Sequence, residues 1–366
     1  MTTNLRSATF GVAAAAAVLM AAATARPATQ PSRLLPADAG RVSALAFGPK
    51  HTVYVGTSPS SSKGRVYEST DDGEHWRLIS ARPWTWFDAL AADPKQPGTL
   101  YAGTATAVYE TADGGRTWRA SGNGLLPPPG VNRGEGWVNW LGVDPANRNV
   151  LYEHDYADTL RTSLDQGRTW RVAAWRTPLG YMEGSALAWT RTPTVYAWFG
   201  GYTARSQVQL ELGLSADGGR TWRRTPLHVT LRTWGSSTIS VDPRHPRTVY
   251  AAAHSQVFVS SDAGAHWQSI GGGLPQNADV TSLAIGKGTI YAVLGTLGIW
   301  ERPVGSGAWT QSWPQSEPTP GPDVSLLTVD PDDPSIVLAA YDPEKGSAGT
   351  HVLRSIDGGR TWTAVG

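Results

Sequence analysis

Carboxylates that could act as a general acid or a nucleophile recur along this chain. They are Asp71, Asp113, Asp165, Asp217, Asp262 and Asp357. Each belongs to one pattern, hydroxyl-x-Asp-x-Gly-x-Thr/His-Trp, as in Ser69 to Trp76. Within it the Asp and Ser/Thr oxygens can accept backbone N–H groups, Gly supplies a positive φ, and Trp starts a buried strand. We therefore interpret these structural aspartates as braces of hairpin turns rather than as catalytic groups.

The spacing of the pattern indicates an array of similar units. Successive aspartates lie 42 to 52 residues apart, except for 95 residues between Asp262 and Asp357. That long gap holds a degenerate copy, Gly298 to Trp309, which keeps the final Trp but has Arg302, Val304 and Ser306 at the hydroxyl, Asp and Gly positions. A fixed period of this size is typical of solenoids, propellers and arrays. The chain therefore contains seven units.

A second repeated phrase gives the same count. It consists of an apolar strand, a turn often reading Asp-Pro-x-x-Pro, and a strand around Val-Tyr-Ala. Its copies are 45–57, 90–104, 141–154, 187–199, 239–253, 283–295 and 327–341. The hydroxyl-x-Asp-x-Gly-x-Thr/His-Trp pattern, here called the box, adds a hairpin of two further strands. Each unit therefore has four short strands with period-2 alternation. This predicts an all-β fold, a seven-bladed β-propeller of four-stranded blades with Asp-box hairpins. A linear solenoid is the alternative, but it needs capping units that are not visible.

The propeller is expected to span residues 41–366 as a single domain. The first unit begins with its own innermost strand near Val42, and the last ends with its own fourth strand at 361–366. Closure would then depend on face packing between the first and last blades, unless Ser32 to Leu35 adds a strand.

Residues 1–25 resemble a signal peptide. Arg6 precedes an apolar stretch, and Ala23-Thr-Ala25 forms a small-x-small cleavage site. An uncleaved anchor is the alternative, but about fourteen apolar residues are short for a bilayer. We expect a secreted, periplasmic or cell-envelope protein with a flexible segment at 26–40 and no membrane span after cleavage.

Composition excludes several classes of function. The 366 residues include no Cys, so disulfide scaffolds and thiol chemistry are excluded. The net charge of +1 gives no overall field that favours nucleic acid. The eight His residues show no metal-ligand spacing, and neither a phosphate-binding loop nor a Gly-x-Ser-x-Gly elbow occurs. We expect no metal and no cofactor.

The boxes resemble the Asp-box, or bacterial neuraminidase, repeat of sialidases, xyloglucan-cleaving glycoside hydrolases, sortilin-type receptors and photosystem II assembly-factor propellers. The resemblance implies that the boxes lie away from any active site. Sialidases typically have six blades and an Arg-Ile-Pro motif, which is absent here. Xyloglucan hydrolases pair two propellers around a cleft, each giving one catalytic Asp, so another chain would have to supply the second. The photosystem II factors are single seven-bladed propellers with Asp-Gly-Gly-x-Thr-Trp boxes, as in Asp113 to Trp118.

A functional site is expected on the face opposite the boxes, on the loops that lead into each innermost strand and on the loops between second and third strands. Candidate catalytic residues there are Asp88, Glu183, Asp279 and Asp323. Candidate ligand-binding residues are Trp84, Trp86, Trp137, Asn139, Trp140, Tyr156, Tyr181, Arg232 and Trp234. Sugar rings stack on Trp and Tyr while carboxylates and Arg bind their hydroxyls.

Alignment of the innermost strands shows a polar residue two places before a shared apolar one in every unit. These positions are Ser43, Asp88, Asn139, Ser185, Ser237, Thr281 and Ser325. They predict a polar ring at the mouth of the central channel. The ring either satisfies hydrogen bonds around a wet channel or anchors a ligand.

Two functional classes follow. The favoured one is a non-enzymatic, monomeric propeller that binds a glycan or an extracytoplasmic protein through its loop face. The alternative is a glycoside hydrolase that uses carboxylates at the channel mouth, which would need two carboxyl groups roughly 5 to 10 Å apart. The sequence leaves open whether the protein is an enzyme.

Overall fold

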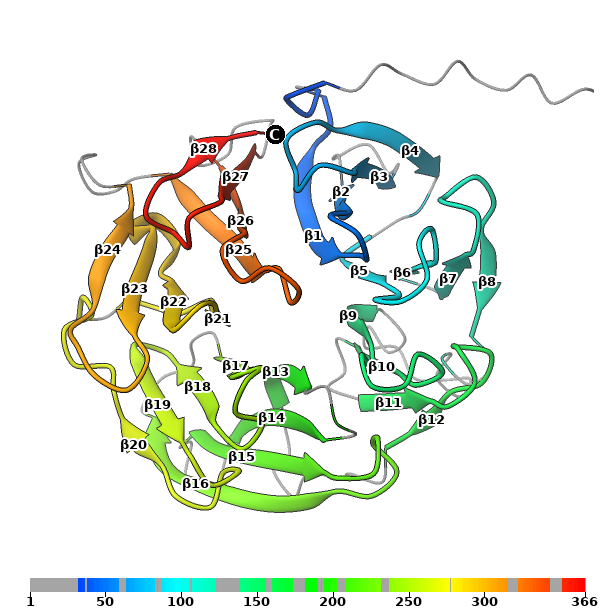
Figure 1. The fold of residues 1–366 in the computed structure, drawn as a ribbon. Helices are drawn as coiled ribbons and strands as arrows, with labels where there is room; N and C mark the ends of the chain where they lie inside the picture. Colours follow the sequence, from blue (N-terminus) through cyan, green and yellow to red (C-terminus); the bar gives the residue numbers. More distant parts are fainter. Residues whose placement is uncertain are drawn as a thin grey trace, which may run out of the picture.

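The protein folds as a ring of seven antiparallel sheets around a central axis, as Figure 1 shows. The structure is a computed structural model that describes residues 32–36, 38–58, 64–82, 84, 87–105, 107–122, 125, 138–155, 160–173, 182–189, 192, 194–202, 208–231, 237–276, 278–314, 322–342 and 351–365. Each sheet has four strands in sequence order, and the only helix in these ranges is the 3-10 turn η1 (Gly295–Leu297). The predicted all-β, seven-bladed propeller is confirmed.

The strands of each blade follow one another from the channel outward. Blade 1 contains β1 (Arg41–Phe47), β2 (Val53–Ser58), β3 (Gly64–Ser69) and β4 (Arg77–Arg82). Blade 2 contains β5 (Ala89–Ala92), β6 (Leu100–Gly103), β7 (Val108–Thr111) and β8 (Arg119–Ser121). Blade 3 contains β9 (Val138–Val143), β10 (Leu151–Asp155), β11 (Leu160–Ser163) and β12 (Arg171–Val172). Blade 4 contains β13 (Met182–Trp189), β14 (Val195–Tyr202), β15 (Val208–Ser215) and β16 (Arg223–Leu231).

The remaining blades repeat this order. Blade 5 contains β17 (Ser237–Val241), β18 (Val249–Ala253), β19 (Gln256–Ser260) and β20 (Gln268–Ser269). Blade 6 contains β21 (Ser282–Ile285), β22 (Thr289–Val293), β23 (Ile299–Pro303) and β24 (Thr310–Trp313). Blade 7 contains β25 (Asp323–Val329), β26 (Val337–Asp342), β27 (His351–Ser355) and β28 (Thr363–Ala364).

Each Asp box is a closed set of local hydrogen bonds between the third and fourth strands. In blade 4 the Ser215 hydroxyl donates to Asp217 Oδ1 at 2.8 Å and accepts the Gly219 N–H at 2.8 Å. Asp217 also accepts the N–H and the hydroxyl of Thr221, at 2.9 and 2.6 Å. The same bonds recur in the other five boxes, with a ring nitrogen of His75 or His266 replacing the threonine hydroxyl in two of them.

The box glycine also forms the contact between neighbouring blades. Gly219 has φ +78°, and a Cβ there would lie 2.6 Å from the ring of Tyr152 in blade 3. In the same way Gly359 of blade 7 faces the ring of Tyr291 in blade 6, at 2.7 Å. The position therefore requires both a left-handed backbone and the absence of a side chain, which only glycine provides.

The boxes and the turns between first and second strands lie on one face, here called the box face. Within a blade, a backbone hydrogen bond joins the box turn to the turn between the first and second strands. In blade 2 the Gly114 N–H donates to the Gly98 carbonyl at 3.0 Å. Equivalent bonds occur in blades 1, 3, 5, 6 and 7. The loops leading into the innermost strands therefore open on the opposite face, here called the loop face, as do the loops between second and third strands.

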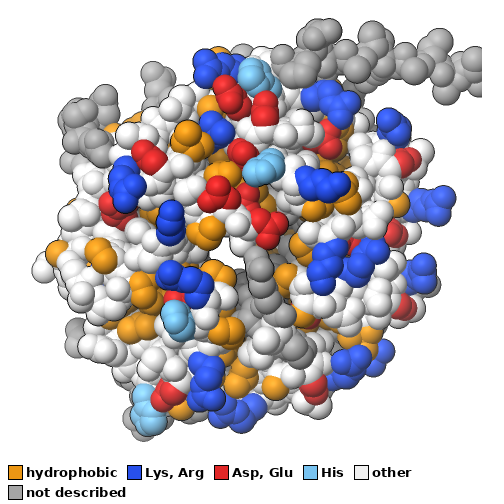
Figure 2. Space-filling view, viewed as in Figure 1, with side chains coloured by type: hydrophobic (Ala, Val, Ile, Leu, Met, Phe, Trp, Pro, Cys, Tyr) orange, Lys and Arg blue, Asp and Glu red, His pale blue; other side chains and the backbone are white. Residues whose placement is uncertain are grey.

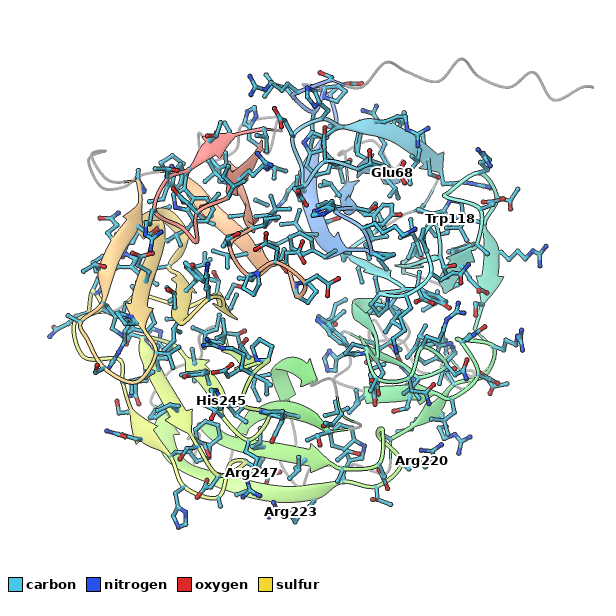
Figure 3. The ribbon with its side chains drawn as sticks, in the orientation of Figure 1. Glu68, Trp118, Arg220, Arg223, His245 and Arg247 are labelled. Carbon is cyan, nitrogen blue, oxygen red and sulfur yellow. The ribbon has the colours of Figure 1, made fainter. Side chains whose placement is uncertain are left out.

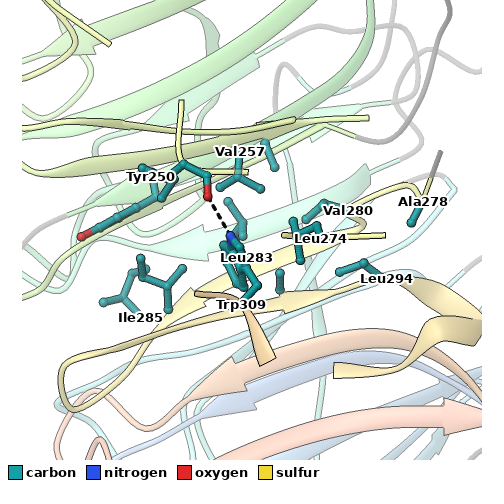
Figure 4. Close-up of a cluster of buried hydrophobic side chains, with 13 residues drawn as sticks. Tyr250, Val257, Leu274, Ala278, Val280, Leu283, Ile285, Leu294 and Trp309 are labelled. Atoms are coloured by element: carbon teal, nitrogen blue, oxygen red, sulfur yellow. Dashed lines mark hydrogen bonds between the residues drawn. The ribbon is translucent and has the colours of Figure 1, made fainter. Parts of the chain in front are cut away.

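The core lies between the blades. The tyrosines of the Val-Tyr-Ala phrase are at most 2% exposed, and the hydroxyls of Tyr196 and Tyr291 donate to carbonyls of the next blade at 2.8 and 2.7 Å. Figure 4 shows one such cluster, which joins blades 5 and 6. There the degenerate unit keeps its tryptophan: Trp309 Nε1 donates to the Ile270 carbonyl at 2.7 Å, and Ile270 comes from blade 5.

The ring closes without strand exchange, because blades 1 and 7 each consist of consecutive strands. Trp76 Nε1 donates to the Val365 carbonyl at 2.6 Å, and Arg354 Nε donates to the Asp72 carbonyl at 2.8 Å. Ser32 adds one bridge to Trp76, and Leu35 is buried in the cluster that joins the two blades. Face packing is therefore the main closure, supported by the segment that precedes β1.

We expect Gly219→Ala to destabilise the fold more than Gly218→Ala. Both glycines have positive φ, but a Cβ at Gly218 meets no atom closer than 3.9 Å. Backbone strain should cost both variants about 1 kcal/mol. Overlap with Tyr152 should cost Gly219→Ala a further ~1–3 kcal/mol. Urea unfolding midpoints measure the difference, and equal midpoints would show that the seam tolerates a side chain.

Candidate functional site

The channel mouth on the loop face is formed by the starts of the innermost strands. In blades 1, 3 and 7 the residue of the predicted polar ring lies at a β-bulge, because Ser43, Asn139 and Ser325 are skipped in the pairing of the first strand with the second. A bulge redirects a side chain relative to the regular pleat. These three positions lie on either side of Asp88, which precedes β5 in blade 2.

Asp88 is held in place by its neighbour Phe87. The hydroxyls of Ser43 and Ser58 in blade 1 both donate to the Phe87 carbonyl, at 2.6 and 2.7 Å. The Phe87 ring is fully buried, and a Cβ at Gly56 would come within 2.8 Å of it. The backbone at Asp88 is thus fixed between blades 1 and 2 while its side chain is only half-buried.

Blade 3 carries a buried ionic cluster behind the mouth. Arg161 Nη1 donates to Glu153 Oε1 at 2.8 Å and to Asp155 Oδ2 at 2.7 Å. The side chains of both acids are fully buried, and that of Arg161 is 6% exposed. Burial, only partly offset by Arg161, raises the pKa of Glu153 to about 8. Burial therefore favours the protonated form of Glu153 at neutral pH.

On the other face of β10, His154 reaches the polar ring. Its Nδ1 lies 3.0 Å from Asn139 Oδ1, and because an amide oxygen only accepts, Nδ1 carries the proton. Burial lowers the pKa of His154 to about 4, so the ring is neutral at pH 7. The imidazole thereby orients the bulged Asn139 amide at the mouth.

His254 and Asp279 join blades 5 and 6 on the loop face. His254 Nδ1 is hydrogen-bonded to Asp279 Oδ1. The Val280 N–H also donates to the His254 carbonyl, at 3.0 Å. His254 has φ +54°, so the link holds a non-glycine residue in a left-handed turn. Their side chains stay 29% and 44% exposed.

Blades 6 and 7 together place aromatic rings on the loop face, where blade 7 also has two acids. Asp323 and Asp342 are directly opposite each other at the ends of β25 and β26, and both are half-buried. Tyr341 packs edge-on against Trp313, with ring centroids 5.2 Å apart, and lies 5.6 Å from the His351 ring. Such rings beside carboxylates resemble the wall and anchors of a pocket for a polar ligand.

The predicted site residues have different positions in the structure. Trp84 is only 7% exposed and packs edge-on against Trp118 at 4.9 Å, so its burial leaves it out of the site. Trp140 is half-buried and packs against the cluster of Tyr152 and Val195 between blades 3 and 4. Glu183 belongs to β13. Six others lie outside the described residues: Trp86, Trp137, Tyr156, Tyr181, Arg232 and Trp234.

The structure also brings together residues that sequence analysis did not select. His154 and His254 contact the predicted site residues Asn139 and Asp279, and Tyr341 contacts Trp313 at the end of the outermost strand of blade 6. Glu153 and Arg161 form the buried cluster of blade 3. Register pairs Glu153 with Arg161 across β10 and β11. Opposite charges at paired positions of adjacent strands were the available signal. The described part of the chain contains no group of three or more His, Asp or Glu side chains placed to bind a metal ion.

Comparison with known proteins shows what this chain is similar to. No protein-family model matches the chain. Two xyloglucanases, from Paenibacillus sp and from Hypocrea jecorina (strain QM6a), are 25% and 24% identical to it over 358 and 348 residues. Each alignment covers 83% of this chain but only 30% and 37% of the relative. The chain therefore spans about a third of the length of these relatives.

Solved structures share the fold at lower identity. The GH74 xyloglucanase of Xanthomonas campestris superposes with a TM-score of 0.57 and 16% identity, over 89% of this chain and 60% of that one. YCF48 bound to D1 peptide superposes with a TM-score of 0.60 and 12% identity, over 88% of this chain and 95% of that one. These neighbours confirm the resemblance to xyloglucanase and photosystem II assembly-factor propellers at the level of the fold. Among the described residues no helix is long and apolar enough to cross a membrane.

We expect Glu153 to make stability fall as pH rises from about 6.5 to about 8. Its folded pKa of about 8 exceeds the ordinary 4.5, so the folded state retains a proton that the unfolded chain releases between these values. Below pH 6.5 His154 acts oppositely, because its folded pKa is depressed. The free energy of unfolding should therefore fall by about 2 kcal/mol between pH 6.5 and 8.

Urea unfolding at several pH values measures this slope. Glu153→Gln, which mimics the protonated acid, should abolish it, and Glu74→Gln, at a half-exposed position in blade 1, should preserve it. A slope that persists in Glu153→Gln would assign the titration to another group.

Proposed function

We propose that this protein binds a polysaccharide of the β-glucan type, such as xyloglucan, at the channel mouth on its loop face. The fixed position of Asp88 between Ser43 and Asn139 is the observation that carries this proposal. A carboxylate, a hydroxyl and an amide at one level can bind successive sugar hydroxyls. Trp313 and Tyr341 supply aromatic surface on the same face. The likeness to two xyloglucanases over most of this chain supports a glucan as the ligand.

Binding is favoured over hydrolysis because the candidate carboxylates are spread around the ring. Asp88, Glu183, Asp279 and Asp323 come from four different blades. Of these four, only Asp279 and Asp323 belong to adjacent blades, and Asp279 is already paired with His254. Hydrolysis needs two carboxyl groups about 5 to 10 Å apart and available to the same glycosidic bond. A hydrolase whose second carboxylate comes from a partner chain is the alternative.

The remaining features of the proposal rest on the sequence. Residues 1–25 direct the protein out of the cytoplasm, and the propeller acts there as a monomer. A protein partner in place of a glycan is favoured by one observation, the likeness to a propeller solved with a bound peptide.

We expect xyloglucan to raise the melting temperature of the protein without release of reducing sugar. Asp88→Asn should weaken binding at least about tenfold, because it removes a charged hydrogen-bond acceptor. Asp332→Asn, an exposed acid on the box face, should leave binding unchanged. Isothermal titration with xyloglucan and a reducing-sugar assay measure both quantities.

Three outcomes would contradict the proposal. Sugar release that disappears in Asp88→Asn would establish the hydrolase. Equal binding by Asp88→Asn and the unsubstituted protein would move the site away from the mouth. Absence of any response to neutral glucans would leave a protein as the ligand of this face.

A further inference from the structure

Three consecutive boxes carry a pair of arginines that the other boxes lack. Blades 2, 3 and 4 each contain Gly-Arg-Thr-Trp-Arg, with the second arginine at the start of the outermost strand. The six residues, here called the arginine arc, are Arg116, Arg119, Arg168, Arg171, Arg220 and Arg223.

The fold does not require these arginines. At the two equivalent positions blade 1 has Glu74 and Arg77, and blade 7 has Arg360 and Thr363. Blade 5 has Ala265 and Gln268, with no charge at all. The boxes of all three blades nevertheless make the same hydroxyl, aspartate and glycine bonds as blades 2 to 4. The arginines are therefore additions to the turn rather than parts of it.

The arc is exposed on the box face. All six residues are exposed, and within the described ranges no side-chain hydrogen bond or salt bridge involves Arg116, Arg119, Arg168, Arg171 or Arg223. Arg220 reaches the carbonyl of its own Asp217 at 2.9 Å. Figure 3 shows Arg220 and Arg223 with Arg247 of blade 5 along the lower rim of this view.

Cations from neighbouring blades lie close enough to act on the same groups. Burial raises the pKa of Glu110, and Arg168, Arg119 and Arg148 all oppose that rise. Burial likewise raises the pKa of Tyr196, and Arg247 of blade 5 and Arg223 of blade 4 oppose it. Arginines of blades 2 and 3 therefore lie near one another across one seam, and arginines of blades 4 and 5 lie near one another across another.

Acidic side chains gather on the same face in blades 1 and 7. Asp72 and Glu74 of blade 1 and Asp332 and Asp333 of blade 7 lie in its turns. Figure 2 shows many Lys and Arg side chains along the right and lower margin of this face, with others at its top and left, and most Asp and Glu side chains in its upper central part. The whole-molecule charge of +1 conceals this separation.

We infer that the arginine arc binds a linear anionic polysaccharide, one whose sugar units carry carboxylate groups. Guanidinium groups match carboxylates in two-pronged geometry. A flexible chain can follow the curve of three blades and avoid the acidic blades. A flat anionic membrane would bring negative charge against the acidic blades as well, so the curved, one-sided distribution favours a polymer. This site lies on the face opposite the proposed glucan site and does not depend on it.

Polygalacturonate is the probe for the full-length protein, with neutral xyloglucan and vesicles of phosphatidylglycerol and phosphatidylcholine as comparisons. Arg119→Gln with Arg171→Gln removes two charges from the arc. Arg77→Gln with Arg360→Gln removes two charges from the same motif outside it. Affinities are measured from about 20 to 200 mM NaCl, because polyanion binding releases counterions and weakens with salt.

We expect polygalacturonate to bind the unsubstituted protein at low salt and to bind the arc variant on the order of tenfold more weakly. In the arc variant the slope of the logarithm of the binding constant against the logarithm of the NaCl concentration should be smaller in magnitude by about 1 to 2. The variant outside the arc should bind within about twofold of the unsubstituted protein. Equal losses of affinity for polygalacturonate in both double variants would show that binding depends only on net charge, which would refute the site. Absence of polygalacturonate binding at low salt would also refute it. Binding to vesicles alone would assign the arc to membranes. Xyloglucan binding should be the same in all variants, so failure of one site is distinguishable from failure of the other.

Discussion

The fold depends on the contact between each box glycine and the preceding blade. Gly219 rests on Tyr152, and Gly359 rests on Tyr291, at distances that leave no room for a side chain. The box hydroxyl and aspartate hold the turn at the required angle; in blade 2 the Thr117 hydroxyl and N–H lower the pKa of Asp113 to about 2, so the brace stays ionised. One local motif thus shapes a hairpin and joins two sheets. The closing seam uses it too, because Gly73 faces Leu338 of blade 7.

Because the box residues stabilise turns and join blades, the two faces differ in which side chains are available to bind a partner. The box aspartates are committed to turn hydrogen bonds, so residues outside that bonding pattern, such as the arginine arc, remain for contact with a partner. On the loop face the strands begin with bulges and polar residues. There Phe87 fixes the backbone next to Asp88 without covering its side chain.

The interface between blades 2 and 3 contains buried charged side chains in addition to apolar ones. Glu153, Asp155 and Arg161 are buried together, which costs desolvation free energy that their attraction repays only with good geometry. Protonation of Glu153, which its burial favours, lowers the number of charged groups in the cluster. The cluster ends at Asp155, the last residue of β10 on the loop face, and it holds the end of that strand beside the mouth.

The blade count, the strand order and the role of the box residues could be predicted from the sequence, because hydrogen bonds and alternation within single repeats specify them. Tertiary structure decided which side chains reach the mouth. Trp84 and Asp88 are close in sequence, yet Trp84 is buried against Trp118 and Asp88 stays half-exposed. The pairs His254–Asp279 and Glu153–Arg161 arise from the packing of adjacent blades and from strand register, respectively. Packing of consecutive blades likewise places arginines of three separate repeats on one part of the box face, since residues about fifty positions apart become neighbours only when the blades pack side by side.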